Sequence, residues 1–159
     1  MTASEIDQAA PVRFNNDPDP DHPGWNRWEL HDDRRFNGQV MGKMLVRLEE
    51  DGKVRTRMFP ELRHTNLLDI LHGGTVLALI DIAIFSGGHT LGLEGMPGSV
   101  TLDLTTQFIG AGRPGVPLDA VAEVLRETKR LVFVRGVVEQ EGELVAAYSA
   151  TIRKARRQS

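Results

Sequence analysis

The chain has 159 residues, of which 40% are hydrophobic and 26% are charged, a composition typical of one soluble globular domain. Its net charge of −3 offers no positive field to the phosphates of a nucleic acid, so we expect no nucleic-acid partner. The absence of cysteine excludes disulfides, thiolate nucleophiles and cysteine-bound zinc. The N-terminal segment resembles no signal peptide, and no apolar run reaches membrane-spanning length, so we expect a cytoplasmic protein without a membrane partner.

Residues 1–24 are polar and rich in Asp and Pro, and we expect them to form a mobile leader because they can bury little apolar surface. Residues 25–159 are then one domain that ends in a basic tail. The domain is predicted to begin with a short helix at residues 25–37, because a helix would bring Trp25 and Trp28, three residues apart, onto one face.

Two strands are predicted next, at residues 39–48 and 53–59, joined by an Asp-Gly pair that is typical of hairpin turns. Alternating apolar and polar residues recur at 99–109, 116–128, 130–140 and 143–153. The connections between these four segments are short, which favours antiparallel neighbours and predicts a meander.

Residues 72–92 have a different pattern, apolar on every side from residue 76 to residue 85 except at Asp81. A helix that is apolar all round must be buried all round. The sequence therefore predicts an α+β fold in which one antiparallel sheet wraps around a single long central helix.

Asp81 carries the unusual chemistry of this helix. A carboxylate among isoleucines and leucines loses hydration, which is costly without compensation. Asp81 either binds buried backbone amides or an arginine in a structural role, or serves as a general base or nucleophile tuned by its apolar surroundings.

His72, Gly73 and Gly74 open the helix. Glycine here is explained either by a turn that needs positive φ or by access to the unpaired amides of the first helical turn, where a substrate oxygen can bind. The second explanation outlines an oxyanion hole.

Gly73 and Asp81 are eight residues apart, and a helix rises about 12 Å over that distance. They cannot both contact one carbonyl group within one chain. A shared site requires a second, antiparallel copy, so we expect a homodimer with two equivalent sites.

The spacing of these residues also resembles a known motif. Asn66 lies six residues before His72, and Asp81 lies nine residues after it, as in hotdog-fold acyl-CoA thioesterases of the phenylacetyl-CoA thioesterase-like group. The order of elements from about residue 35 to residue 154 is also similar to that family.

The resemblance implies roles for the matching residues. Asp81 is the base or nucleophile, and the Gly73 amide polarises the thioester carbonyl. Asn66 orients the carboxylate or its water, and His72 supports the thioester end. A hydroxyl on the strand after the helix acts across the dimer interface, and by position we expect this to be Thr101 rather than Ser99.

Coenzyme A, as part of the substrate, is expected to bind near Gly74, Arg113, Lys129 and Arg130, with no separate cofactor and no metal. The resemblance also implies that dimers pair into tetramers. One departure is Asp69, where such proteins often have glycine. It leaves the shape of the loop open and places a second acid near the site, which either acts on Asp81 or faces solvent.

Hydrolysis of acyl-CoA thioesters is therefore the expected function. Two alternatives are a non-catalytic acyl-CoA binding or regulatory module, which would not need Asp81, and a hotdog dehydratase or isomerase, whose motif is less similar. The acyl group is not predicted by the sequence.

Overall fold

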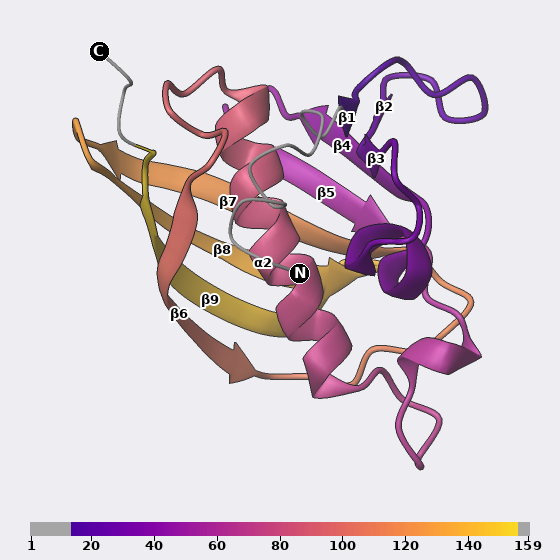
Figure 1. Cartoon of the computed structure of the whole chain (residues 1–159). Coiled ribbons are helices and arrows are strands. Elements are labelled where there is room, and N and C mark those ends of the chain that lie inside the picture. The colour runs from indigo at the N-terminus through magenta and orange to yellow at the C-terminus, as the bar shows by residue number, and fades with distance from the viewer. Residues whose placement is uncertain (1–13, 156–159) are drawn as a thin grey trace, which may run out of the picture.

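The computed structural model describes residues 14–155, and within this range it contains nine strands, one long helix and two short helical turns (Figure 1). The elements are β1 (Phe14–Asn15), β2 (Asn26–Arg27), β3 (Glu29–Leu30), the π-helical turn η1 (Asn37–Met41), β4 (Met44–Leu48), β5 (Val54–Met58), the 3₁₀ turn η2 (Leu62–His64), α2 (Gly73–Thr90), β6 (Val100–Phe108), β7 (Leu118–Glu127), β8 (Leu131–Gln140) and β9 (Glu143–Arg153). No helix in the described range is both long and apolar enough to cross a membrane.

Seven strands form one antiparallel sheet in the order β2-β4-β5-β7-β8-β9-β6, and β1 and β3 form a separate pair. The sheet curves around α2, which lies across one face (Figure 1). The predicted hotdog fold, an antiparallel sheet around one long central helix, is confirmed.

The core lies between α2 and the concave face of the sheet. Leu79, Ile80 and Ile84 of the helix are fully buried against inward-facing sheet residues such as Met58 and Leu118. This continuous contact fixes the helix relative to the sheet, since close-packed interiors tolerate little displacement.

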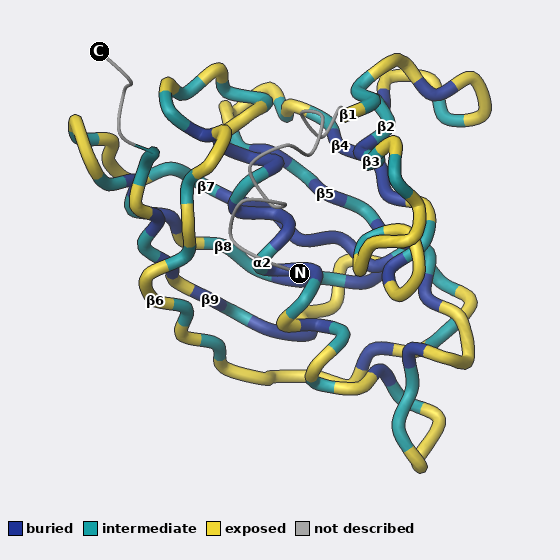
Figure 2. The backbone as a smooth tube through the Cα atoms, viewed as in Figure 1, coloured by how far each residue is buried: buried dark blue, intermediate teal, exposed yellow. Residues whose placement is uncertain are grey.

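The position of β6 differs from the predicted meander. β7, β8 and β9 are consecutive neighbours, but β6 pairs only with β9 and forms one edge of the sheet. The prediction that 99–109 neighbours 116–128 is therefore wrong, because the connection after β6 leads away from it to the centre of the sheet. Figure 2 shows that β6 is exposed along much of its length.

The predicted helix at residues 25–37 is also wrong. This segment forms β2 and β3, and β2 pairs with β4. Trp25 and Trp28 do not share a helical face: Trp28 joins the core, whereas Trp25 is covered by the guanidinium groups of Arg47 and Arg57, 4.4 and 4.5 Å from its ring. Pairing with the sheet has overridden a weak local helical pattern.

The hairpin predicted around Asp51 and Gly52 is confirmed, since β4 and β5 are antiparallel neighbours. The first predicted strand, however, starts too early. Residues 37–41 form η1, and Gly42 follows with a φ of 72°, a conformation that separates this turn from β4.

The predicted leader at residues 1–24 is only partly described. Residues 1–13 lie outside the described range, as do residues 156–159 of the predicted basic tail. Residues 14–24 are not a free leader, because Asp19 is buried and lies 2.7 Å from His22, 2.9 Å from Lys43 and 3.2 Å from Arg27. The hydrogen bond with His22, followed by those with Lys43 and Arg27, holds the pKa of Asp19 well below its usual range.

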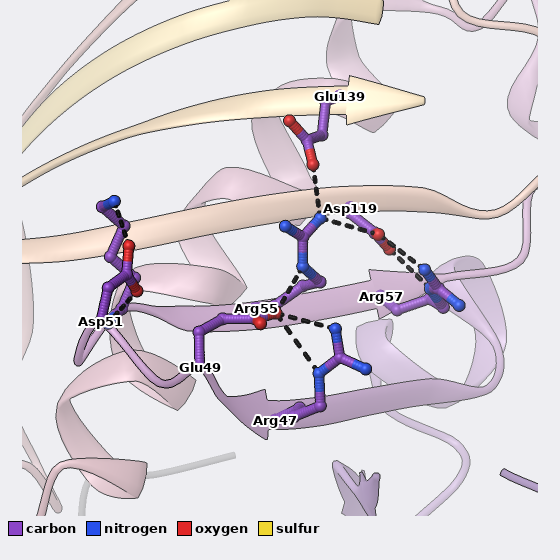
Figure 3. A network of polar contacts seen from close by, with 8 residues as sticks. Arg47, Glu49, Asp51, Arg55, Arg57, Asp119 and Glu139 are labelled. Atoms are coloured by element: carbon purple, nitrogen blue, oxygen red, sulfur yellow. Dashed lines mark hydrogen bonds and ion pairs between the residues drawn. The ribbon is translucent and has the colours of Figure 1, made fainter. Parts of the chain in front are cut away.

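The outer face of the sheet carries a network of ion pairs (Figure 3). Arg55 contacts Glu49, Asp119 and Glu139 at 2.6 to 3.1 Å, and Arg57 also binds Asp119. Carboxylates surround the central guanidinium, so these charges largely satisfy one another.

Replacing Asp19 by Asn should lower resistance to guanidinium chloride at neutral pH, measured by tryptophan fluorescence. Because the pKa of Asp19 is lowered on folding, its contribution is complete above the unfolded pKa of about 3.9 and is lost as the pH falls below that value. The difference between Asp19→Asn and the unmodified protein should therefore shrink below about pH 4. Asp21→Asn is the control, since that side chain is 78% exposed, and an equal effect of both substitutions would contradict the prediction.

Candidate active site

The start of α2 leaves one backbone amide free. The imidazole Nδ1 of His72 accepts a hydrogen bond from the Gly74 amide at 2.8 Å, and the His72 carbonyl accepts from Thr75 at 2.9 Å. Among residues 14–155, the Gly73 amide has no hydrogen-bond partner. Of the two glycine amides at this helix start, only that of Gly73 is available to a ligand.

Gly73 also has little room for a side chain. A Cβ atom at this position would lie 3.3 Å from the ring of Phe108, at the end of β6. At Gly74, a Cβ would lie 3.0 Å from Nδ1 of His72. It would disturb the hydrogen bond by which the His72 side chain caps the helix. Both glycines are thus explained by close contacts, without a positive φ.

The cap also sets the tautomer of His72. Because Nδ1 accepts a hydrogen bond, the proton of the neutral ring is assigned to Nε2. The exposed His72 ring therefore presents an N–H donor beside the free Gly73 amide.

Asn66 lies in a tight loop between η2 and α2, which projects from the body of the molecule (Figure 1). Its side-chain oxygen accepts from the Leu68 amide at 2.8 Å, and its carbonyl accepts from the Asp69 amide at 3.1 Å. The first bond forms an Asx turn, which leaves the Asn66 side-chain NH₂ as a donor. Asn66 and His72 line the same pocket, of about 560 Å³.

Asp69 keeps the loop turned despite replacing the expected glycine. Its φ is 55°, in the left-handed region, and its side chain is exposed. Aspartate tolerates this conformation better than most residues, with some strain, and of the two alternatives for its side chain the structure shows the solvent-facing one.

Asp81 is half-buried and lies about two helical turns after Gly73. The Thr101 hydroxyl on β6 donates to its Oδ1 at 2.7 Å, and no arginine or backbone amide binds this carboxylate within the described range. The structural explanation that we considered for Asp81 therefore finds no support. The Ser99 hydroxyl instead donates to the Met96 carbonyl at 2.5 Å.

The contact between Thr101 and Asp81 is made within one chain. The role expected of this hydroxyl across an interface stays a prediction. β6 leaves the end of the helix and runs back beside it, so the strand brings its own threonine to the carboxylate.

The structure thus holds two groups of predicted residues. Asn66, His72 and Gly73 gather at the start of α2, and Asp81 and Thr101 form a separate pair. No described hydrogen bond joins the two groups. The helix is unbroken between Gly73 and Asp81, which keeps them about 12 Å apart along its axis.

The candidate cations for coenzyme A also divide into two groups. Lys129 and Arg130 line a pocket of about 860 Å³ together with Arg153 and Lys154. Arg113 pairs with Glu141, beyond the opposite end of β8. A strand of this length spans about 34 Å, so within one chain Arg113 cannot bind the same phosphate as Lys129.

Sequence analysis missed His64, a fully buried residue that holds the site together. Its Nδ1 accepts from the Glu61 amide at 2.8 Å, and its Nε2 donates to the Val40 carbonyl at 2.6 Å. Its own carbonyl accepts from the His72 amide at 2.9 Å and from the Thr75 hydroxyl at 3.1 Å. A single histidine without a spaced partner gives no sequence signal for such a role.

Comparison with known proteins identifies relatives of this chain. The family model described as "Thioesterase superfamily" matches residues 68–147. Proteins of Homo sapiens and Pongo abelii, both named acyl-coenzyme A thioesterase 13, are each 32% identical over 95 residues, which are 60% of this chain and 66% of each relative. The match thus spans just under two thirds of these relatives.

Solved structures show the same architecture. Zebrafish thioesterase superfamily member 2 superposes with a TM-score of 0.65 at 25% identity, covering 74% of this chain and 86% of that one. The Escherichia coli PaaI protein of the phenylacetic acid degradation operon has the same TM-score at 20% identity, covering 77% and 86%, and supports the fold. The resemblance predicted from the motif is confirmed at the level of family and fold.

Replacing Asp69 by Gly should raise the free energy of unfolding by about 0.5–1 kcal/mol, because relief of left-handed strain exceeds the added entropy of the unfolded chain. Asp69→Ala should lower it, since alanine keeps the strain. Urea denaturation measures both changes, and destabilisation by Asp69→Gly would contradict the observed φ.

Replacing His64 by Ala should lower the free energy of unfolding by about 3 kcal/mol, because it leaves a cavity and two unpaired backbone groups. Thr75→Val, which removes only the hydroxyl bond to the His64 carbonyl, should cost about 1 kcal/mol, and Thr75→Ser should restore it. Urea denaturation again gives the values. Equal stability of Thr75→Val and Thr75→Ser would exclude a role for this bond.

Proposed function

The chain belongs to the thioesterase superfamily, and from that premise we propose that it hydrolyses acyl-coenzyme A thioesters to a free acid and coenzyme A. One observation carries the proposal: the Gly73 amide is free while the neighbouring Gly74 amide is bound by His72. A single donor at the positive end of a helix suits the oxygen of a thioester carbonyl, on which negative charge develops during attack.

Asp81 supplies the second requirement, a carboxylate that no cation neutralises within the described range. Thr101 fixes one carboxylate oxygen and leaves the other for a water molecule. As a base, Asp81 takes a proton from water while the hydroxide adds to the carbonyl carbon. The carbon–sulfur bond then breaks, and the leaving thiolate takes up the proton.

Asp81 can instead attack the carbonyl carbon directly and form a mixed anhydride that water hydrolyses. Labelled solvent oxygen in the Asp81 carboxylate after a single turnover would establish the anhydride route, in which water attacks the aspartyl carbonyl of the anhydride. Either route uses the same two chemical groups.

The site is proposed to form between two copies of the chain. Gly73 and Asp81 are too far apart on one rigid helix, and an antiparallel second helix would bring the carboxylate of one copy to the amide of the other. The exposed edge strand β6 offers its free backbone groups for such pairing. Further pairing of dimers into tetramers is part of the same proposal.

The phosphates of coenzyme A are proposed to bind in the pocket of Lys129, Arg130, Arg153 and Lys154. Val100 lines this pocket and directly precedes Thr101, the partner of Asp81, so the cationic pocket and the carboxylate lie at the same end of β6. Arg113 is left out because it lies at the other end of the sheet, where it pairs with Glu141. Lys154 already pairs with Glu127, so Lys129, Arg130 and Arg153 are the cations proposed to bind the phosphates. Lysine and arginine side chains suit phosphate groups.

Asp81→Asn should reduce kcat for acyl-CoA hydrolysis by a factor of about 100 to 10,000, because it removes the base or nucleophile without changing the shape of the side chain. Release of free thiol measures the rate, and calorimetry measures acyl-CoA binding. Asp21→Asn is the control, since this side chain is 78% exposed and lines neither of the proposed pockets. Binding without hydrolysis by the unmodified protein would indicate the non-catalytic acyl-CoA binding module instead.

Mixing Asp81→Asn with Asn66→Ala should test the shared site. If each site takes Asn66 from one copy and Asp81 from the other, a mixed dimer has one intact site, and equal mixing should restore about a quarter of the unmodified activity. Co-expression with two different affinity tags allows the mixed species to be purified and assayed. No recovery in a purified mixed dimer would refute the shared site.

A further inference from the structure

The loop that carries Asn66 also carries two apolar side chains that the fold leaves uncovered. Leu67 is 102% exposed relative to an extended reference, and Leu68 is 76% exposed. The loop is nevertheless well defined, because Thr65 pairs with Leu71 at its base and the Asn66 amide donates to the Ile70 carbonyl at 2.9 Å. An ordered turn thus keeps both leucine side chains exposed to solvent.

The position of the leucines is tied to the polar part of the site. Leu67 and Leu68 line the pocket of about 560 Å³ that Asn66 and His72 also line. The Leu68 amide is bound by the Asn66 side chain at 2.8 Å, so the leucine and the carboxamide move as one unit. One small surface therefore combines polar donors with an adjacent apolar wall.

From this arrangement we infer that Leu67 and Leu68 form the wall that binds the acyl chain and set the preference for its length. The inference rests on the proposed hydrolysis of acyl-CoA thioesters. An acyl thioester has the complementary pattern, a polar carbonyl next to an apolar chain. With the carbonyl at the Gly73 amide, beside His72, the first methylene groups of the acyl chain meet the two leucines.

The apolar wall accounts for a preference between acyl groups without a closed cavity. Each methylene group removed from water contributes to affinity, so side chains that contact the chain discriminate against short acyl groups. Asn66 and His72 contact the part that all acyl thioesters share and cannot provide this discrimination. The leucines are specificity residues, and the thioester chemistry does not depend on them.

The double variant Leu67→Ala, Leu68→Ala tests the inference. Binding of acetyl-, hexanoyl- and dodecanoyl-CoA is measured by calorimetry on Asp81→Asn protein, so that substrate is not consumed. The leucine substitutions should weaken dodecanoyl-CoA binding about tenfold or more and leave acetyl-CoA binding nearly unchanged. The single substitution Leu68→Met keeps an apolar side chain of similar size. Unlike the double alanine variant, it should therefore show the same dependence of binding on acyl-chain length as the protein with both leucines.

Leu62→Ala is the matched control, because Leu62 is 71% exposed in the neighbouring turn but does not line the pocket. It should leave binding of all three ligands unchanged. Analytical ultracentrifugation of each variant records the association state.

Two results would overturn the inference. One is equal weakening for all three acyl-CoAs, and the other is dissociation of the oligomer by the leucine variant, which would show that a second copy covers the leucines. The proposed function fails separately, if the unmodified protein hydrolyses no acyl-CoA while binding still depends on Leu67 and Leu68. Because binding and turnover are measured independently, the two failures are distinguishable.

Discussion

The rigidity of helix α2 is the constraint on which the other features depend. Its buried side packs continuously against the sheet, so the helix can neither bend nor slide to bring its two chemical groups together. Gly73 offers a free amide at its start, and Asp81 offers a carboxylate two turns later. In the proposed shared site, two antiparallel copies accommodate this separation, because the amide of each then lies opposite the carboxylate of the other.

The hydrogen bonds at the start of the helix determine which groups remain reactive. His72 uses Nδ1 to bind Gly74, so the other ring N–H of His72 and the Gly73 amide are donors without a partner in the described range. His64 fixes this arrangement from behind, since its ring binds two backbone groups and its carbonyl holds both His72 and Thr75. Donors held in place by buried contacts need little reorganisation when charge develops on a substrate oxygen.

The sequence predicted what depends on local pattern and missed what depends on long-range pairing. The alternation of apolar and polar residues predicted the positions of β7, β8 and β9 closely. The apolar run around Asp81 predicted α2, and His72 is the residue that caps its start. The sequence did not reveal that β6 pairs with β9, because an edge strand and a central strand can share one alternation. Pairing between distant segments also overrode the local pattern near Trp25, where the sequence predicts a helix and the chain forms strands.

The two faces of the sheet explain where function can reside. On the outer face, Arg55 and Arg57 are bound by carboxylates, and Arg47 and Arg57 cover Trp25, so few charges there remain unsatisfied (Figure 3). On the helix side, Leu77 is 37% exposed and lies on the same stripe of α2 as Gly74 and Asp81, and Asp81 contacts Thr101 of the edge strand β6. In the proposed dimer, a second copy would cover this apolar residue and the unpaired strand backbone of β6. Pairing at this edge would bury the stripe and complete both sites in one step.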